Sequence, residues 1–371
     1  MDYGAITIDT SIFKQYQFKF DGDWLKKLEY FRESNYPLLL SEIVIKETLA
    51  QIEEQVEQSK KSLLSGINKH SKTLFLDHTV VDKAKTLLVK EVDDGDFVKK
   101  KLNAFMQSVG AETILASGRI DIDRLINMYF EIQPPFGNTK EKRKEFPDAM
   151  TLMSLEAWAI ENKKKILAVS TDHDWAAFAK TSTHIDVIED LVEAISIFQP
   201  PSLTSNSLSQ SLAKLPDKKP KDLYDSISES LSTQIENHLL YPEATSAYYY
   251  EVSSASLYLK EFNFVTDSEG KALISVIEGS DIEWAVGITL IITVDASAFF
   301  EFSVKDWIDK DMVRIGSADV TKEVTFESSA ILEINVGENL EDLELENLLL
   351  SFSPLEIDFG EIEPDQGDEY Q

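Results

Sequence analysis

The sequence predicts a two-part protein: an α/β domain with a central parallel sheet, followed by a mainly-β, sandwich-like domain. Residues 1–198 alternate short apolar stretches with amphipathic ones, which is typical of strands and helices around a parallel sheet. The next segment, residues 199–222, is rich in Pro, Ser and Lys and ends this alternation. From residue 247 onward, β-branched and aromatic stretches are separated by turns containing Gly, Asp and Ser, which predicts a sandwich or small barrel.

The elements of the first part follow from apolar spacing. Ile45, Leu49, Ile52 and Val56 recur at intervals of three and four residues and therefore share one face of a helix. The run KKILAVST is apolar without alternation, as in a central strand buried on both faces. We predict strands at 5–9, 37–41, 164–171 and 184–188, helices at 21–35, 45–56, 147–160, 173–180 and 189–197, and a largely helical segment at 72–130.

These patterns divide the chain into four parts. The first is an α/β domain at residues 1–198, and the second is a linker at 199–222. A helix and an acidic β-rich domain are predicted for residues 223–360. The last residues, 361–371, are acidic and predicted to be disordered.

The composition excludes several classes of site. The chain has 371 residues and no Cys, so disulfides, thiolate metal sites and Cys nucleophiles are absent. The five His residues do not have the spacing of zinc ligands, and no glycine-rich phosphate loop is present. The N-terminus lacks a basic start and an apolar signal core, and no apolar run is long enough to span a membrane. We therefore expect a cytoplasmic protein with no membrane partner.

The net charge of −30 is unevenly distributed. Residues 1–200 carry 32 acidic and 26 basic side chains, a net charge of −6, which leaves 34 acidic and 10 basic for residues 201–371, a net charge of −24. The second half would repel nucleic acid. It suits a basic protein partner, a divalent cation, or solubility alone.

Acidic residues follow the predicted strands or begin helices. Asp9 ends the first strand, and Asp172 and Asp174 follow the strand ILAVS. Asp148 lies in the first turn of a predicted helix, and Glu47 lies on the helix after strand 37–41. Each has an ordinary structural alternative, such as a turn acceptor, a helix cap or a solvated helix residue.

Considered together, these acids favour a metal site. The carboxyl ends of parallel strands meet at one edge of the sheet, where ligands bind in open α/β folds. Crowded carboxylates repel one another unless a divalent cation lies among them. Oxygen ligands suit Mg²⁺ or Mn²⁺, and such a cluster is typical of metal-assisted phosphodiester hydrolysis.

Four segments in order resemble the PIN domain, specifically the PIN-like nucleases of bacteria: ITIDTSIF, PLLLSEIVIKETL, FPDAMTLMSLEAWA and ILAVSTDHDWAAF. The resemblance covers residues 1–198 and implies an α/β/α sandwich with a metal-dependent ribonuclease or structure-selective nuclease site. The segment between residues 60 and 135 is longer than in the smallest such domains, and the β-rich half lies outside the resemblance.

The resemblance also implies roles for the acids. Asp9, Asp148 and Asp172 would bind the metal directly, and Glu47 and Asp174 would bind it or orient its waters. The nucleophile would be a water activated by Mg²⁺ or Mn²⁺, without a covalent intermediate.

Other residues near these acids are candidate substrate contacts. The segment NTKEKRKEF contains basic side chains able to guide a phosphate backbone: Lys140, Lys142, Arg143 and Lys144. The small or polar side chains of Thr10, Ser11, Thr171 and His173 lie beside the predicted acids. The alternatives are an ordinary solvated loop and ordinary turn residues.

The sequence leads to one main functional hypothesis and two alternatives. The main one is a metal-dependent nuclease acting on nucleic acid, RNA favoured over DNA, in a toxin–antitoxin or phage-defence context. One alternative is a catalytically silent PIN-fold scaffold that acts through its C-terminal domain, with a protein partner or as a homo-oligomer. The other, an aspartyl-phosphate phosphatase, is disfavoured because residue 11 is Ser11 rather than a second acid.

Overall fold

The computed structural model divides the chain into two compact units, residues 1–198 and 199–371. It describes residues 3–89, 96–137, 139, 145–199, 203–279, 282–306, 311–337, 342–351 and 354–365. No helix in these ranges combines the length and the apolar character needed to cross a bilayer. Each unit has its own core and is described separately.

A five-stranded parallel sheet forms the centre of the N-terminal unit, in the order β3-β2-β1-β4-β5. The strands are β1 (Tyr3–Ile8), β2 (Leu38–Ser41), β3 (Glu112–Ile114), β4 (Lys165–Val169) and β5 (Ile185–Ile188). The predicted parallel α/β class is confirmed. Strand β3 was not predicted, because three residues are too few to show a period within a largely helical segment.

The order of the strands creates a switch point at the centre of the sheet. From β1, the chain proceeds to β2 and β3 on one side, and later returns to β4 and β5 on the other. Strands β1 and β4 are neighbours, and their last residues, Ile8 and Val169, are paired in register. The residues that follow these two strands must therefore lie side by side, at the position where open α/β sheets bind ligands.

The N-terminal unit contains ten α-helices within its described residues: α1 (Thr10–Gln15), α2 (Asp23–Lys26), α3 (Tyr30–Glu33), α4 (Glu42–Thr73), α5 (His78–Val89), α6 (Phe97–Ser108), α7 (Ile122–Glu131), α8 (Phe146–Asn162), α9 (His173–Ala179) and α10 (Leu191–Ile197). The single helix predicted at 21–35 is instead α2, a 3₁₀ turn and α3. Helix α4 is 32 residues long, so it continues well beyond the predicted segment.

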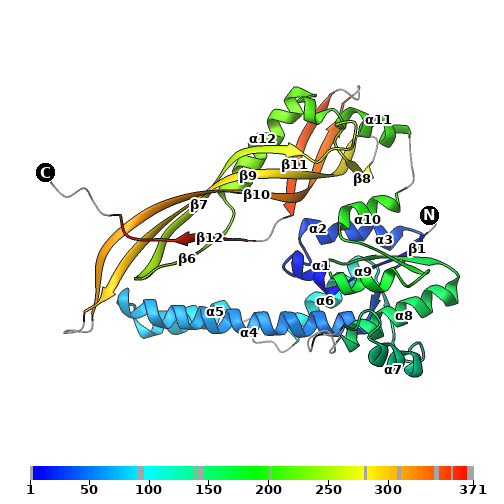
Figure 1. Ribbon diagram of the computed structural model, residues 1–371, viewed down its shortest axis with the longest axis horizontal. Helices are drawn as coiled ribbons and strands as arrows, with labels where there is room; N and C mark the ends of the chain where they lie inside the picture. The colour runs from blue at the N-terminus through cyan, green and yellow to red at the C-terminus, as the bar shows by residue number, and fades with distance from the viewer. Residues whose placement is uncertain are drawn as a thin grey trace. The chain divides into compact units, whose positions relative to one another are not determined.

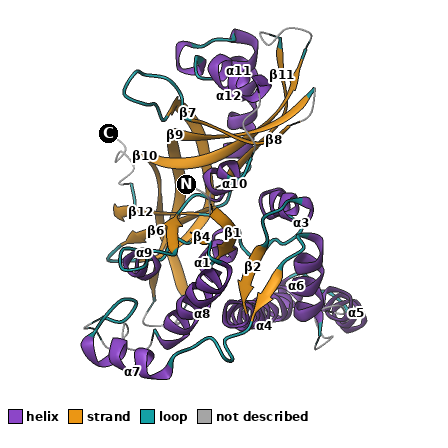
Figure 2. Cartoon of the chain, turned by 90° about the vertical axis from the view of Figure 1, so that its right-hand side faces the viewer, coloured by secondary structure: helices purple, strands orange, loops and turns teal. Residues whose placement is uncertain are grey.

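Helix α8 has more buried residues than any other of these helices and contacts β2, β3, β4 and β5. Figure 2 shows it beside the sheet. Its buried residues occupy several sides, among them Ala149, Leu152, Met153, Leu155 and Ala159. An apolar helix of this kind is stable only inside a core. The packing therefore holds the first turn of α8, with Asp148, at a set position relative to the sheet.

The C-terminal unit is built on an antiparallel sheet in the order β11-β10-β9-β7, with β8 pairing β9 (Figure 1). Its strands are β7 (Tyr249–Phe264), β8 (Ile274–Gly279), β9 (Glu283–Lys305), β10 (Met312–Val336) and β11 (Leu343–Ser351). A parallel pair, β6 (Leu240–Thr245) and β12 (Leu355–Glu361), forms a second small sheet. The mainly-β prediction is confirmed.

Helices cover part of the large sheet, where the sequence led us to expect a second β layer. Helix α12 (Lys221–Glu236) contacts β7 and β11, and α11 (Leu203–Leu212) contacts β8. Every fourth residue of α12 from Leu223 to Ile235 is buried, which gives the helix a continuous apolar stripe. The β6–β12 pair contributes Phe359, whose ring lies 5.6 Å from that of Phe300 on β9.

Two segments differ from the predicted linker and disordered tail. Within residues 199–222, helix α11 places Leu208 and Leu212 in the core with no exposed surface. At the other end, Ile362 is 3% exposed, and the Asp365 N–H donates to the Ser317 carbonyl at 3.0 Å. Both predictions were based on the polar composition of these segments, but a few apolar contacts suffice to order a segment against a core. Residues 200–202 and 366–371 lie outside the described residues.

Candidate active site

Asp9 lies between β1 and α1 and is 5% exposed. Its carboxylate accepts hydrogen bonds from the N–H groups of Thr10 at 2.6 Å and Ser11 at 3.3 Å. The hydroxyl of Ser170 donates to Asp9 Oδ2 at 2.9 Å. Asp9 therefore does have the structural role that the sequence suggested as an alternative to metal binding: it accepts backbone hydrogen bonds in the turn and caps α1. These bonds hold the carboxylate at the carboxyl end of β1.

The segment after β4 lies directly beside Asp9. Ser170, which is 1% exposed, also accepts the N–H of Asp172 at 3.0 Å. Asp172 caps α9 by accepting the N–H of Asp174 at 2.7 Å, so its alternative role is also present. The Thr171 N–H donates to Ser11 Oγ at 3.2 Å. Ser170 and Ser11 thus connect the ends of β4 and β1, and Ser170 was not predicted from the sequence.

Asp148 reaches the same region from α8. The indole N–H of Trp175, which is fully buried in α9, donates to Asp148 Oδ1 at 2.9 Å. The side chain of Glu145, immediately before α8, hydrogen-bonds to the Asp148 carboxyl. Two carboxyl groups can share a hydrogen bond only when one of them carries a proton. Neither Trp175 nor Glu145 was among the site residues predicted from the sequence.

Glu47 approaches from α4 and is half-buried. The hydroxyl of Thr10 donates to Glu47 Oε2 at 3.5 Å, which is a long hydrogen bond. Asp9, Glu47 and Asp148, from three separate segments, lie near enough for their charges to interact. No Lys or Arg of the described residues forms an ion pair with any of these three.

The electrostatics follow from this crowding. Burial raises the pKa of the Asp9 carboxyl, although the hydrogen bonds from Ser11, Ser170 and Thr10 oppose the shift. Burial, and then the charge of Asp9, raises the pKa of Glu47. Burial, the Glu145 hydrogen bond and the charges of Asp9 and Glu47 raise the pKa of Asp148 to about 8. The site therefore has an excess of negative charge once its carboxyls ionise, and protons relieve it in the absence of a cation.

Within the described residues, no three acidic or His side chains are arranged so that they could already hold a metal ion. The hydrogen bonds explain this, because Asp9 and Asp172 are turned toward backbone N–H groups as helix caps and Asp148 is turned toward Trp175. Each carboxylate oxygen has more than one acceptor position, so these bonds leave capacity for a ligand. The oxygen-only donor set, with no ion pair to a Lys or Arg in the part of the chain that the structure describes, fits Mg²⁺ or Mn²⁺.

The candidate substrate contacts are only partly described. Thr10 is buried and touches Glu47, and Ser11 is half-buried beside Ser170. Thr171 and His173 are exposed at the start of α9. The basic residues Lys140, Lys142, Arg143 and Lys144 lie outside the described residues.

Comparison with known proteins supports the assignment of the first unit. A family model described as PIN domain matches residues 6–175. This range contains all five acids of the predicted site. No curated protein matches the chain, and no solved structure does. The N-terminal unit, with its five-stranded parallel sheet and its match over residues 6–175, is a PIN domain.

Proposed function

We propose that the N-terminal unit is a divalent-metal-dependent nuclease that hydrolyses phosphodiester bonds, with RNA favoured over DNA. PIN domains are typically nucleases of this kind. One observation carries the proposal for this chain: Asp9, Glu47 and Asp148 come from separate segments, lie near enough at the switch point for their charges to interact, and form no ion pair with a Lys or Arg of the described residues. Carboxylates held so close destabilise a fold unless they serve a ligand.

The proposed roles follow from the positions of the side chains. Asp9, Asp148 and Asp172 would hold Mg²⁺ or Mn²⁺, and Glu47 and Asp174 would complete the coordination or orient water. The cation, when bound, supplies charge to hold the scissile phosphate, to lower the pKa of water and to stabilise the leaving oxygen.

Neighbouring residues prepare these acids. Ser170 fixes Asp9 Oδ2, and the Trp175 N–H fixes Asp148 Oδ1. Because the pKa of Asp148 is raised, loading the site requires this carboxyl to lose a proton, so affinity for the cation increases with pH. Without a cation the carboxylates repel a phosphate backbone, which prevents productive binding.

The preference for RNA and a toxin–antitoxin or phage-defence setting belong to the same proposal and rest on the family alone. The acidic C-terminal unit would serve a basic protein partner or self-association, since its net charge disfavours nucleic acid.

A catalytically silent scaffold is a second candidate, and one observation favours it. Asp9 and Asp172 already have structural roles as helix caps, and among the described residues no three acidic or His side chains are arranged so that they could hold a metal ion. In this case the fold would bind RNA or protein without a metal, and the acids would be needed only for folding.

A cleavage assay separates the two candidates. Labelled RNAs and DNAs are incubated with wild type, Asp148→Asn and Asp9→Asn in Mn²⁺, Mg²⁺ or EDTA. Asp82→Asn, an exposed carboxylate on α5, is the matched control. Cleavage that needs metal and falls at least about 100-fold in both site variants, but not in the control, supports the nuclease. An inert wild type that still binds RNA or protein in EDTA overturns it and favours the scaffold.

Thermal denaturation of each variant is needed beside the assay. Asp9→Asn replaces one acceptor oxygen by an N–H donor, which conflicts with the donors of Ser11 and Ser170. Lost activity in Asp9→Asn alone, accompanied by a large loss of stability, would reflect misfolding. Asp148→Asn retains an oxygen for the Trp175 N–H and is the more informative variant.

A further inference from the structure

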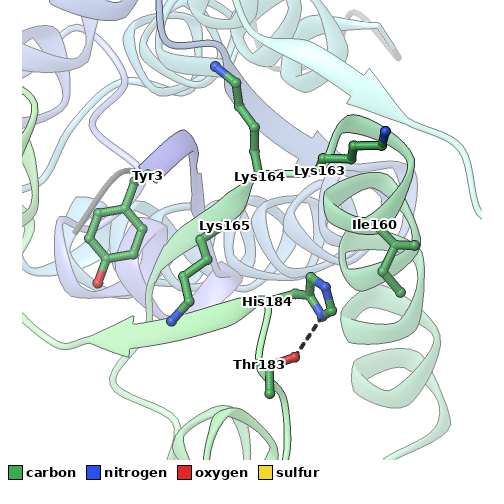
Figure 3. Close-up of a pocket in the computed structure, with 7 residues that line it drawn as sticks. All are labelled: Tyr3, Ile160, Lys163, Lys164, Lys165, Thr183 and His184. Atoms are coloured by element: carbon green, nitrogen blue, oxygen red, sulfur yellow. Dashed lines mark hydrogen bonds between the residues drawn. The ribbon is translucent and has the colours of Figure 1, made fainter.

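A second site lies at the opposite edge of the parallel sheet from the acids. Its pocket has a volume of about 540 Å³ and is lined by Tyr3, Ile160, Lys163, Lys164, Lys165, Thr183 and His184 (Figure 3). Tyr3 and Lys165 begin β1 and β4, and His184 immediately precedes β5. The pocket is therefore at the amino ends of these strands. Strand β4 has five residues, so its length, at ~3.3 Å per residue, separates the two sites.

The pocket is positively charged within an acidic protein. Lys165 Nζ lies 3.0 Å from Asp186 Oδ2, which also accepts the Tyr3 hydroxyl at 2.9 Å. Lys163 and Lys164 form no ion pair with a carboxylate of the described residues. Asp186 thus neutralises about one of the three lysines. The pocket retains an excess of positive charge although the chain has a net charge of −30.

The backbone positions two of these side chains closely. The stem of Lys164 crosses β1 at Gly4, where a Cβ would lie 2.0 Å from Lys164 Cδ. Gly4 is therefore required for the lysine to take this path. On the other side, His184 Nδ1 and Thr183 Oγ1 are hydrogen-bonded at 3.1 Å, which orients the imidazole ring (Figure 3).

We propose that this pocket binds the terminal phosphate of a small ligand of mononucleotide size. Lys163 and Lys164 would supply the positive charge that phosphate oxygens require, and His184 would donate a hydrogen bond from a ring N–H. Tyr3 and Ile160 lie on opposite sides of the pocket (Figure 3) and each offers apolar surface to a base or sugar, and the pocket's volume is typical of small-molecule sites. The side chains of Lys163, Lys164 and Lys165 point in different directions (Figure 3), so the amines of Lys163 and Lys164 would turn toward the phosphate when it binds.

The competing explanation is local to α8. The helix ends at Asn162, and lysines beyond its last turn offset the partial negative charge of its C-terminus. That role needs no ligand and makes no use of Tyr3, His184 or the glycine at position 4. Binding measurements distinguish the two explanations, and they do not depend on the proposed nuclease activity.

The test is calorimetric titration of the full chain in EDTA, which prevents metal-mediated binding at the acidic site. The probes are pyrophosphate, ATP, and one short oligonucleotide with and without a 5′-phosphate. The double variant Lys163→Gln/Lys164→Gln is compared with Lys219→Gln/Lys221→Gln, which removes the same charge from exposed positions in the other unit. We expect wild type to bind its tightest probe with a dissociation constant below about 1 mM. The pocket variant should bind the same probe at least about tenfold more weakly than wild type and the control variant do.

The probes also identify the source of the phosphate. Tight binding of ATP with weak binding of both oligonucleotides indicates a free nucleotide. Binding that requires the 5′-phosphate indicates a nucleic-acid end. Equally tight binding of the oligonucleotides with and without the 5′-phosphate, equal weakening in the two double variants, or no binding of any probe overturns the proposal. As a second readout, the ring proton signals of His184 should shift during titration in wild type and not in Gly4→Ala, in which Lys164 is displaced.

Discussion

Replacing Asp148 by Asn should stabilise the protein in the absence of metal, and increasingly so as the pH rises. The pKa of the Asp148 carboxyl is raised from its ordinary value of 3.8 to about 8, first by burial and then by the Glu145 hydrogen bond. Folding therefore takes up a proton between these two pH values. Below about pH 4 this carboxyl is protonated in both the folded and the unfolded chain, and it does not lower the free energy of unfolding. As the pH rises toward 8, the unfolded chain loses the proton first, and the free energy of unfolding decreases. An amide has no such dependence.

The magnitude follows from the size of the shift. About four pKa units correspond to roughly 6 kcal/mol at ~1.4 kcal/mol each, which is an upper bound for the ionised site. Burial is the largest cause of the shift and also acts on the Asn amide, and the Glu145 hydrogen bond is changed by the substitution, so only part of this is recovered. We expect a gain of about 2 kcal/mol above pH 8, equivalent to a rise in Tm of ~4–8 °C for a unit of this size. Near pH 4 the gain should vanish.

Thermal denaturation followed by circular dichroism in EDTA, at about pH 4.5 and about pH 8.5, measures this difference. Asp82→Asn is the control, because its carboxylate is exposed on α5 and its replacement should leave the Tm within about 1 °C at both pH values. A variant that is equally or less stable than wild type at the higher pH would refute the reasoning. It would show that the carboxyls at the switch point do not crowd as the structure indicates.

Three further outcomes are expected. Ser170→Ala removes the hydroxyl that donates to Asp9 Oδ2, so the free energy of unfolding measured by urea denaturation at neutral pH should fall by about 1–2 kcal/mol. An unchanged free energy of unfolding would mean that another donor replaces the hydroxyl. Trp175→Phe removes the N–H bound to Asp148, which raises that pKa further and should move the onset of metal-stimulated cleavage to higher pH; an unchanged pH profile would contradict this. Leu208→Ala should destabilise the C-terminal unit by about 2–4 kcal/mol, whereas a substitution in a true linker would have no effect.

The parallel sheet and the positions of Asp9 and Asp172 were predictable from the sequence. Apolar runs of four to six residues alternating with longer amphipathic segments leave few arrangements other than a parallel sheet. Residues that follow neighbouring parallel strands then meet at one edge, so acids at strand ends converge whatever the details of packing. The mainly-β character of the second half was equally clear from its β-branched and aromatic runs.

Other features depend on contacts between residues far apart in the chain. Ser170, Trp175 and Glu145 join the site through hydrogen bonds to acids on other segments, and no local pattern marks them. Helix α11 is polar in composition and is ordered by the buried side chains of Leu208 and Leu212.

The sequence by itself therefore determined the fold class and the edge of the sheet at which the acids gather, because strand and helix periodicities are local properties and their alternation favours parallel strands whose carboxyl ends share one edge. Only the tertiary structure decided how close the carboxylates lie, which hydrogen bonds hold them and how far their pKa values shift. Burial and charge interaction depend on distance in space, which spacing along the chain does not specify.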